Sequence, residues 1–533
     1  MPFLLKERKH HKVIFKRRQM ADFSTSSATL ASNERLVSGD QQTRQPGLVN
    51  KEHSYADSNA LASVSGTSSY HFMMSTKTMG TGRAHASIVP DLFTQLPICR
   101  DLHRTESSQV QDETTKECLP FLAGLDPNAE YNDHGVPRLS RDRHIAFLHK
   151  TLGKLPPRYV AADASRPWMF YWALTGLATL GEDVSDYRER LINTVRPIQN
   201  LTGGFGGGNG QMSHLAPTYA ILLSLAIVGG TEAMEIIDRK SMWKWLSMLK
   251  QPEGGFRMSV GGEEDVRGAY IATVIITLLD LPLELHPDSP AWSHEKTNLI
   301  TGLPEWISRC QTFEGGMSAR PDVEAHGAYA FCALACLSII GDPREIISKY
   351  LDVPLLISWL SARQYAPDSG FSGRTNKLVD GCYSHWVGGC WPLLEACLNA
   401  TSNSEMNLAS ITSDGKLFSR EGLVRYILCC CQDQSKRGGL RDKPSHTSDS
   451  YHTCYVLAGL SSAQNNWLFN ASESQTQAGD PLTSAFQWNS EPIIESSQIF
   501  DEQDRIGTLH PVFVIPQGTA EEMRAYFTSR GGF

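Results

Sequence analysis

The sequence predicts an all-α protein that folds as an α-α toroid (an α/α6 barrel), with an inner ring of helices sheathed by an outer ring. Two observations lead to this prediction. Apolar residues recur with helical spacing in segments such as APTYAILLSLAIVGG, AYIATVIITLLDL and GAYAFCALACLSII. A short phrase containing a glutamine and one or two glycines returns between such segments, whereas few stretches show the alternation typical of a β-strand.

The repeated phrase sets the length of each structural unit. The interval between phrases is roughly 50 to 70 residues, the length of a helix pair with its connections. A Gly-Gly pair ends one helix with positive φ and lets the next helix approach closely. Helix pairs cannot bury their apolar faces alone, so we expect about five or six of them to stack into a closed ring. One phrase, DSGF (368–371), has a single glycine, which we expect only to loosen helix packing. The phrases begin at Gln199, Gln251, Gln311, Gln364 and Gln432.

Composition divides the chain into three parts. Residues 1–115 are rich in Ser, Thr and Gln and poor in periodic apolar residues, which predicts a disordered tail. Residues 116–465 carry the repeats and are expected to form the α-α barrel. Residues 466–533 return to loop composition, and their last part (LHPVFVIPQGTAEEMRAYFTSR) predicts an extended segment and a short helix that packs on the barrel.

The overall composition argues against several classes of protein. Of the 533 residues 41% are hydrophobic, and the net charge of −8 leaves no basic footprint for nucleic acid outside the first residues. The opening MPFLLKERKHHKVIFKRR lacks the apolar core of a signal peptide, and no stretch approaches the roughly 18 apolar residues of a membrane span. The 12 cysteines lack the regular spacing of a disulfide framework. We therefore expect a cytoplasmic protein with reduced thiols, no nucleic-acid partner and no membrane span.

The segment GFSGRTNKLVDGCYSHW (370–386) contains a candidate metal site. Asp380 and Cys382 together with one histidine would form an O, S, N donor set that suits zinc, and three ligands leave the fourth position open, as in catalytic sites. Because Asp380 and Cys382 are two residues apart, they cannot share a face in mid-helix and should converge from a helix N-terminus or the loop before it. Spacing leaves the third ligand open between His385 and His452, and a lone Asp-x-Cys also occurs without any metal.

Basic and aromatic residues near the same helix starts indicate a pocket for a ligand that is anionic at one end and apolar at the other. Arg374, Lys377 and Tyr383, with His326 from the preceding repeat, have the side chains to hold a diphosphate, although Arg and Lys at this spacing also fit a surface ion pair. Aromatic residues at the starts of the predicted inner helices suit a polyprenyl chain, and each also fits ordinary core packing. They are Trp168, Trp172, Tyr219, Tyr270, Tyr329, Trp386, Tyr451 and Tyr455.

Motifs in a fixed order across residues 140–465 give the chain a family resemblance. They are SRPWMFYW, GGFGGG…HLAPTYA, VGGEEDVRGAY, EAHGAYAFC, GRTNKLVDGCYSHW and YHTCYVLAGLS. Together they resemble the β subunits of the protein prenyltransferases, which are toroids of helix-pair repeats. The resemblance implies one zinc ion per β subunit, with Asp380, Cys382 and His452 as its ligands.

The resemblance also implies roles for the neighbouring residues. His326, Arg374, Lys377 and Tyr383 would bind the diphosphate, and Tyr329 and Trp386 would line the isoprenoid. The peptide would contact Trp168, Trp172 and Tyr451, with Arg267 near its C-terminal carboxylate. Further members of the donor pocket would be Gly327, Ala328, Thr375, Asn376, Ser384 and His385.

Two features favour the farnesyl branch of this family. Asp442 stands shortly before His452, where farnesyl enzymes place an aspartate that supports Mg²⁺ on the diphosphate and geranylgeranyl enzymes place a lysine. Trp168 and Tyr455 match the two aromatic residues that shorten the farnesyl pocket.

The implied reaction transfers the farnesyl group of farnesyl diphosphate to the cysteine thiol of a C-terminal CaaX protein, through a zinc-bound thiolate. Lys377, Tyr383, Arg374 and His326 would meet the charge of the departing diphosphate. The family implies a heterodimer with an α subunit. The alternatives are a geranylgeranyltransferase β subunit, a terpene cyclase toroid, for which no DxDD motif is present, and a non-catalytic toroid.

Overall fold

The computed structural model describes residues 88–97, 102–401, 417–470, 482–494 and 498–531. The chain divides into two units, Met1–Met79 and Gly80–Phe533, and the described residues all belong to the second unit. The disorder expected for the N-terminal tail, as far as residue 87, therefore lies outside the described residues.

Helix α2 (Glu106–Leu122) runs across the expected start of the barrel at residue 116. A capping box begins this helix, because the Thr105 side chain accepts from the Ser108 backbone N–H and the Ser108 hydroxyl accepts from the Thr105 N–H. Cys118 and Leu122 are buried and anchor the helix on the described unit. Helical structure therefore begins before residue 116.

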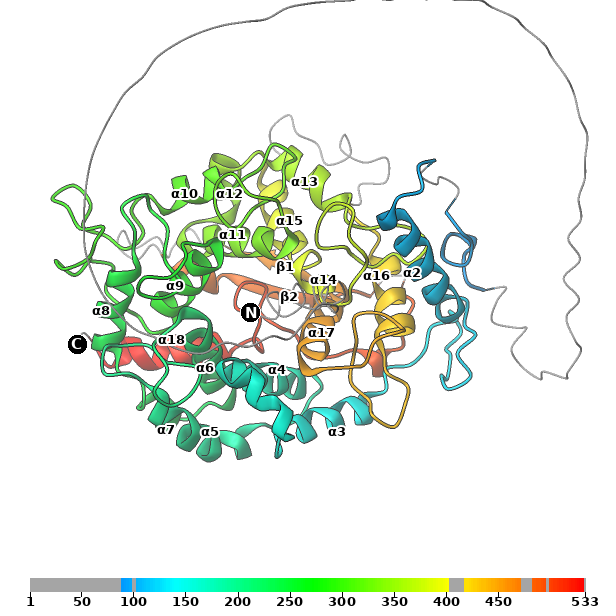
Figure 1. Cartoon of the computed structure of the whole chain (residues 1–533), viewed down its shortest axis with the longest axis horizontal. Coiled ribbons are helices and arrows are strands. Elements are labelled where there is room, and N and C mark those ends of the chain that lie inside the picture. Colours follow the sequence, from blue (N-terminus) through cyan, green and yellow to red (C-terminus); the bar gives the residue numbers. More distant parts are fainter. Residues whose placement is uncertain (1–87, 98–101, 402–416, 471–481, 495–497, 532–533) are drawn as a thin grey trace, which may run out of the picture. The chain divides into compact units, whose positions relative to one another are not determined.

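An inner ring of largely buried helices surrounds the centre of the unit (Figure 1). Consecutive members contact one another in the order α4, α6, α9, α11, α14 and α17, and α17 contacts α4, which closes the ring. This closure confirms the predicted toroid. The inner helices are α4 (Arg166–Thr179), α6 (Leu215–Val228), α9 (Val266–Leu278), α11 (Gly327–Ile340), α14 (Tyr383–Trp386) with α15 (Cys390–Thr401), and α17 (Ser450–Gln464).

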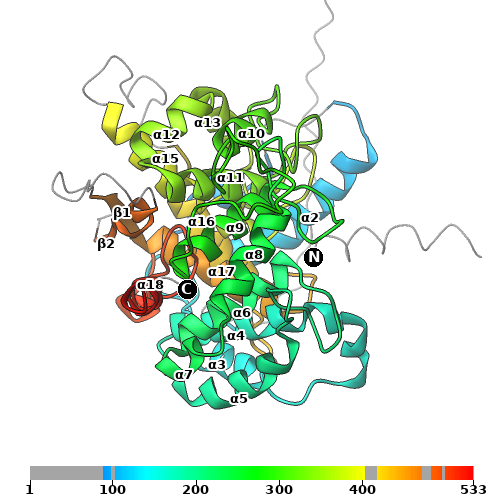
Figure 2. The same ribbon diagram turned by 90° about the vertical axis from the view of Figure 1, so that its left-hand side faces the viewer.

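The outer helices are amphipathic and cover the inner ring. In α8, for example, Met242, Trp245 and Leu249 are buried, and the Asp238 side chain caps the helix start. Burial of one large apolar side chain of this kind contributes about 1.5–3 kcal/mol. Figure 2 shows α5 and α7 at one side of the unit and α10, α12 and α13 at the other. The outer helices are α3 (Arg141–Thr151), α5 (Arg188–Val195), α7 (Thr231–Met234), α8 (Arg239–Leu249), α10 (Leu303–Arg309), α12 (Pro343–Tyr350), α13 (Val353–Ser361) and α16 (Arg420–Arg425), which continues as a π-helix to Cys431.

The repeated phrases form tight turns that join outer to inner helices. In the first phrase Gln199 pairs with Phe205 in an isolated β-bridge, and equivalent bridges occur in the later phrases. Gly203 has φ 96°, and a Cβ there would overlap the carbonyl oxygen of Ser241. The fourth phrase keeps the same bridge, with Ser369 (φ 59°) in place of the first glycine.

Each phrase is followed by a loop that leads into the next inner helix, and these loops have the same length. The side chain of the last loop residue accepts a hydrogen bond from a backbone N–H at the start of that helix. Neighbouring loops are tethered, as where the Gly327 N–H donates to the Gly373 carbonyl and the Gly381 N–H donates to the Asp442 carbonyl. The loops therefore lie side by side along one rim. They are 206–214, 257–265, 318–326, 372–380 and 441–449, and they end at His214, Asp265, His326, Asp380 and Asp449.

The C-terminal part packs against the inner helices. The Tyr270 hydroxyl donates to the Val512 carbonyl (2.7 Å), and the Tyr171 hydroxyl donates to that of Val514 (2.8 Å). Helix α18 (Thr519–Ser529) contacts α6, α7 and α9. An antiparallel pair, β1 (Asn465–Phe469) and β2 (Trp488–Pro492), was not predicted, because five-residue strands carry too little periodicity to be recognised.

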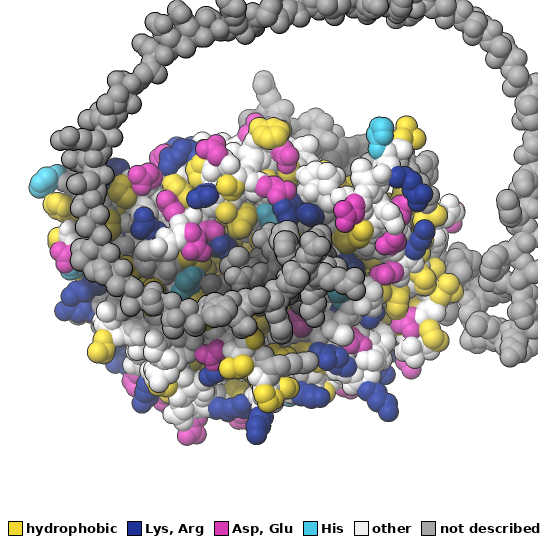
Figure 3. Space-filling model, viewed as in Figure 1, with side chains coloured by type: hydrophobic (Ala, Val, Ile, Leu, Met, Phe, Trp, Pro, Cys, Tyr) yellow, Lys and Arg dark blue, Asp and Glu magenta, His cyan; other side chains and the backbone are white. Residues whose placement is uncertain are grey.

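The surface of the described residues carries both signs of charge. Figure 3 shows Lys and Arg side chains interspersed with Asp and Glu over the described part of one face. Within the ranges that the structure describes, no helix is both long enough and apolar enough to cross a membrane.

Candidate active site

Three residues from two neighbouring repeats meet at the rim of the inner ring. One ligand atom from each of Asp380, Cys382 and His452 lies within 4.8 Å of the other two, and all three residues are buried. The Asp380 Oδ1 accepts from the Cys382 N–H (3.0 Å) and lies 3.1 Å from His452 Nε2. The O, S, N donor set fits zinc, and three protein ligands leave one position for a further donor.

Asp449 orients the histidine of this group. Its Oδ2 lies 2.8 Å from His452 Nδ1, and its Oδ1 accepts from the His452 backbone N–H (2.8 Å). A proton on Nδ1 leaves Nε2 directed at Asp380, the arrangement that carboxylates impose on metal-binding histidines. Burial lowers the pKa of His452, but the Asp380 and Asp449 carboxylates outweigh it and hold that pKa well above its ordinary value. A metal ion would therefore displace a proton from Nε2.

His385, the other candidate for the third ligand, lies in an aromatic cluster. Its ring centroid is 4.5 Å from that of Phe331, 4.9 Å from Trp386 and 5.4 Å from Tyr455. Burial lowers the pKa of His385 to about 3, so the imidazole is neutral near pH 7. The structure brings His452, and not His385, together with Asp380 and Cys382.

The residues expected to bind a diphosphate adjoin this group. His326 Nδ1 accepts from the Ala328 N–H, so the proton of the neutral ring belongs on Nε2, which lies 3.1 Å from the Tyr383 hydroxyl. Burial lowers the pKa of His326 to about 3. The Arg374 guanidinium forms an ion pair with Glu324 of the preceding loop.

The tip of the 372–380 loop is solvent-accessible. Thr375, Asn376 and Lys377 are exposed, and Asn376 has φ 58°. By contrast, Ser384 at the start of α14 is completely buried, and Gly327 and Ala328 at the start of α11 are buried as well. The exposed tip therefore presents the charged side chain of Lys377, whereas the neighbouring helix starts are buried.

Asp442 is the second residue of the loop next to the metal candidates. Its carboxylate lies 2.8 Å from Lys443 Nζ and 3.2 Å from His446 Nδ1, and the residue is buried. Its backbone carbonyl accepts from the Gly381 N–H (2.9 Å), which places it beside the segment that carries Asp380 and Cys382. A role in holding Mg²⁺ stays a prediction.

Aromatic rings from every inner helix form a closed circle of contacts. Each ring centroid lies 4.5–5.9 Å from the next, the range in which aromatic pairs attract one another. An apolar wall of this kind suits an extended isoprenoid. In order, the circle is Trp168, Tyr219, Tyr270, Phe331, Trp386, Tyr455, Tyr451, Trp172 and again Trp168.

Both residues predicted to limit donor length, Trp168 and Tyr455, belong to this circle. Trp168, Trp172 and Tyr451, which were expected to meet the peptide, are consecutive members of it. Arg267 lies outside the circle, where it forms a bidentate ion pair with Asp265.

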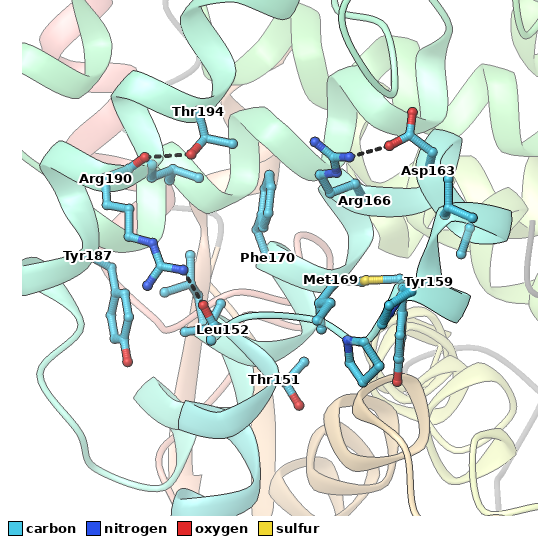
Figure 4. A pocket seen from close by; sticks show the side chains of 18 residues that line it. Thr151, Leu152, Tyr159, Asp163, Arg166, Met169, Phe170, Tyr187, Arg190 and Thr194 are labelled. Carbon is cyan, nitrogen blue, oxygen red and sulfur yellow. Dashed lines mark hydrogen bonds and ion pairs between the residues drawn. The ribbon is translucent and has the colours of Figure 1, made fainter.

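A cavity of about 440 Å³ lies on the other face of α4 (Figure 4). Its lining includes Met169 and Phe170 of α4, Leu191 of α5 and the ion pair between Arg166 and Asp163. It shares no residue with the metal candidates or the aromatic circle, so it is separate from the chemistry proposed for the rim.

Sequence reasoning did not assign a role to Asp449 or to Glu324. The signal for Asp449 was present, because it ends a loop of the same length as the one that ends at Asp380. The partnership of Glu324 and Arg374 had no local signal, since it joins two different repeats.

Comparisons with known proteins agree with this architecture. Residues 139–515 match the family of the prenyltransferase alpha-alpha toroid domain. The protein farnesyltransferase subunit beta of Pyricularia oryzae is 58% identical over 85% of this chain and 88% of its own length, and that of Schizosaccharomyces pombe is 37% identical over 80% and 98%. The structure of Candida albicans protein geranylgeranyltransferase-I complexed with GGPP has a TM-score of 0.53 at 21% identity, covering 73% of this chain and 99% of that one, which shows a shared fold.

Proposed function

The chain belongs to the family of protein farnesyltransferase β subunits, and on this premise we propose that Asp380, Cys382 and His452 hold a catalytic zinc ion. Membership makes the chain the catalytic β subunit of a prenyltransferase. The observation that carries the proposal is the meeting of three different donor atoms in one buried place, from two separate repeats. Structural packing alone gives no reason to bury a carboxylate, a thiol and an imidazole together.

The metal, when bound, supplies Lewis-acid activation that lowers the pKa of a coordinated thiol. Asp380, Cys382 and His452 leave a fourth position for the cysteine thiol of a C-terminal CaaX protein. Asp449 holds the Nδ1 proton of His452 and so keeps Nε2 available as a donor. These residues therefore place a thiolate at the rim, where the loops meet.

The second substrate in this proposal is farnesyl diphosphate. Arg374, Lys377 and the His326–Tyr383 pair bind its diphosphate and donate to the oxygens on which charge develops as the bond to C1 breaks. Asp442 assists by holding Mg²⁺ on the diphosphate. The aromatic circle takes the isoprenoid chain, with Trp168 and Tyr455 limiting its length to the farnesyl group.

The proposal includes a heterodimer with a farnesyltransferase α subunit in the cytoplasm. Exposed apolar side chains at the tips of two phrases would suit contact with such a partner: Leu201 is 98% exposed and Phe313 is 92% exposed. All tests below therefore use the β chain co-expressed with an α subunit.

Metal content is the first test. We expect one zinc per heterodimer in the wild type and none in His452→Ala, whereas His385→Phe retains the metal because it keeps an aromatic ring in the cluster with Phe331 and Tyr455. Zinc that survives in His452→Ala, or that is absent from the wild type, would overturn the proposed metal site.

Donor length tests the proposed isoprenoid pocket. In Trp168→Thr the pocket loses most of an indole ring, and we expect the ratio of kcat/KM for the farnesyl over the geranylgeranyl donor to fall by about 100-fold. Met169→Ala on the opposite face of α4 is the matched control. An unchanged donor ratio in Trp168→Thr would mean that this residue does not close the pocket.

A further inference from the structure

Arg363 connects an outer helix to the loop that carries Arg374 and Lys377. It follows the end of α13 and is only 4% exposed. Its Nε donates to the Trp359 carbonyl (3.1 Å), and its guanidinium carbon lies 4.6 Å from the centre of the Trp359 ring. Its Nη1 donates to the Thr375 hydroxyl at the tip of the loop (3.1 Å).

Buried arginines are normally paired with a carboxylate. Among the residues that the structure describes, no carboxylate forms an ion pair with Arg363. A carbonyl, a hydroxyl and an aromatic face contact its guanidinium, and the Glu314 carboxylate acts on its charge without forming an ion pair. An anion bound by the loop would supply further negative charge.

The equivalent residues of the other repeats show that the contact made by Arg363 is specific to the fourth repeat. The residue before the phrase glutamine is Ile198, Lys250, Cys310 or Cys431 elsewhere and Arg363 here. Lys250 is also buried, but its Nζ donates to the Gly254 carbonyl inside its own phrase (2.6 Å). At the position before the phrase glutamine, a cation that reaches the following loop therefore occurs in the repeat whose loop carries the proposed diphosphate-binding side chains.

We propose that Arg363 is a positioning residue for the diphosphate: by holding Thr375, it fixes the loop tip from which Arg374 and Lys377 reach the ligand. This inference rests on the proposed function of that loop. Two backbone hydrogen bonds hold the beginning of the loop, from the Ser372 N–H to the Arg363 carbonyl (2.8 Å) and from the Gly327 N–H to the Gly373 carbonyl (2.8 Å).

The Arg363–Thr375 hydrogen bond is the side-chain contact that reaches further, into the exposed tip. Without this hydrogen bond the loop tip samples other conformations, and part of the free energy of diphosphate binding is spent on selecting the conformation that binds. The loss should appear in binding of the diphosphate group and leave the peptide site unaffected.

The test measures dissociation constants of the heterodimer for farnesyl diphosphate and for inorganic diphosphate. We expect Arg363→Met to weaken both by about 10- to 100-fold and Thr375→Val by about 3- to 10-fold. The double variant should bind no more weakly than Arg363→Met, because both changes remove one contact. Zinc content and the KM for the peptide should stay unchanged.

Two controls separate the possible failures. Lys250→Met removes a buried cation from an equivalent turn and should lower thermal stability without changing diphosphate affinity. Arg374→Ala tests the site itself, and unchanged diphosphate affinity in this variant would reject the proposed function of the loop. If Arg374→Ala weakens binding while Thr375→Val and Arg363→Met do not, Arg363 is only structural and the inference is wrong. Should Arg363→Met fail to fold, Arg363→Lys, which keeps the charge and loses the planar guanidinium that joins Trp359 to Thr375, takes its place in the same comparison.

Discussion

The loops 318–326 and 372–380 are neighbours on the rim, and their backbones follow the same path. Each begins with a serine whose N–H donates to the residue before the phrase glutamine. Each has an arginine at its third position, a positive φ at its fifth, at Asp322 and Asn376, and a bridge between its first and eighth residues. In both, the side chain of the last loop residue accepts from the backbone N–H two residues further along, at Ala328 and at Cys382.

The chemistry of the two loops differs at the same positions. The last loop residue is His326 in the third repeat and Asp380 in the fourth. The seventh residue is the apolar Leu378 in the loop of Arg374 and Glu324 in the third loop, where its carboxylate pairs with Arg374. A common backbone thus provides equivalent positions on the rim, and the substitution of individual side chains makes one position a candidate metal ligand and its neighbour a hydrogen-bond donor.

The largest effect is expected at the last position of the two loops. Asp380→Ala should abolish zinc binding and lower kcat by about 10³-fold or more, because the thiol is then neither activated nor placed. His326→Ala, at the equivalent position, should retain the zinc and weaken diphosphate binding. Metal analysis and single-turnover rates of the heterodimer distinguish these outcomes. Loss of zinc in both variants would mean that Asp380 and His326 act only by holding the rim together.

The two loop arginines provide the second test. Arg374→Ala should weaken farnesyl diphosphate binding by about 100-fold, since a charge-assisted contact to the diphosphate is lost. Arg320→Ala removes an exposed arginine from the same position of the third loop and should leave that affinity unchanged. Equal effects would indicate a general electrostatic attraction instead of a defined diphosphate site.

The toroid was predictable from the sequence because its signals are local. Helical periodicity and the glutamine-glycine phrases are visible within short windows, and Asp380 and Cys382 stand two residues apart. The choice between His385 and His452 was not decidable from spacing, because it depends on how α14 packs against α17. The Arg374–Glu324 and Arg363–Thr375 contacts could not be predicted from the sequence for the same reason, since each joins segments that only the tertiary structure brings together.

The turn of the fourth repeat also predicts a pH dependence of stability. Burial raises the pKa of Asp368 to about 7, whereas in the unfolded chain it is near 4. The folded state therefore binds the proton more tightly, and stability is lost as the pH rises from about 4 towards 7. Asp368→Asn should remove this loss and stabilise the heterodimer at pH 8 by about 2–4 kcal/mol, with little effect at pH 4.5.

Denaturant unfolding of the heterodimer at several pH values measures this effect. Glu314→Gln is the control from the third repeat, where the exposed Glu314 accepts from the Trp359 indole N–H (3.2 Å). If Asp368→Asn gains no more stability at pH 8 than at pH 4.5, Asp368 is already ionised in the folded protein at both pH values.

The smallest effect concerns how the fourth turn tolerates a serine where the third has Gly315. A Cβ at Gly315 would overlap the carbonyl oxygen of Leu355, whereas Ser369 faces Gly422 of α16, where a Cβ would lie 2.6 Å from that of Ser369. In the third repeat the glycine of this contact lies in the turn, whereas in the fourth repeat it lies in the helix that packs against the turn. Gly422→Ala should cost about 1–2 kcal/mol through overpacking, partly offset by the better helix propensity of alanine.

The double variant Gly422→Ala/Ser369→Gly restores the arrangement of the third repeat. It should recover most of the lost stability. A glycine at position 369 has no Cβ to obstruct the methyl group that Gly422→Ala introduces, and it adopts the positive φ of this position without the strain that a serine has there. Thermal unfolding of the two single variants and the double variant gives the coupling directly. Additive losses would show that the two residues do not share this contact, and that the third and fourth turns resemble each other only in their backbone.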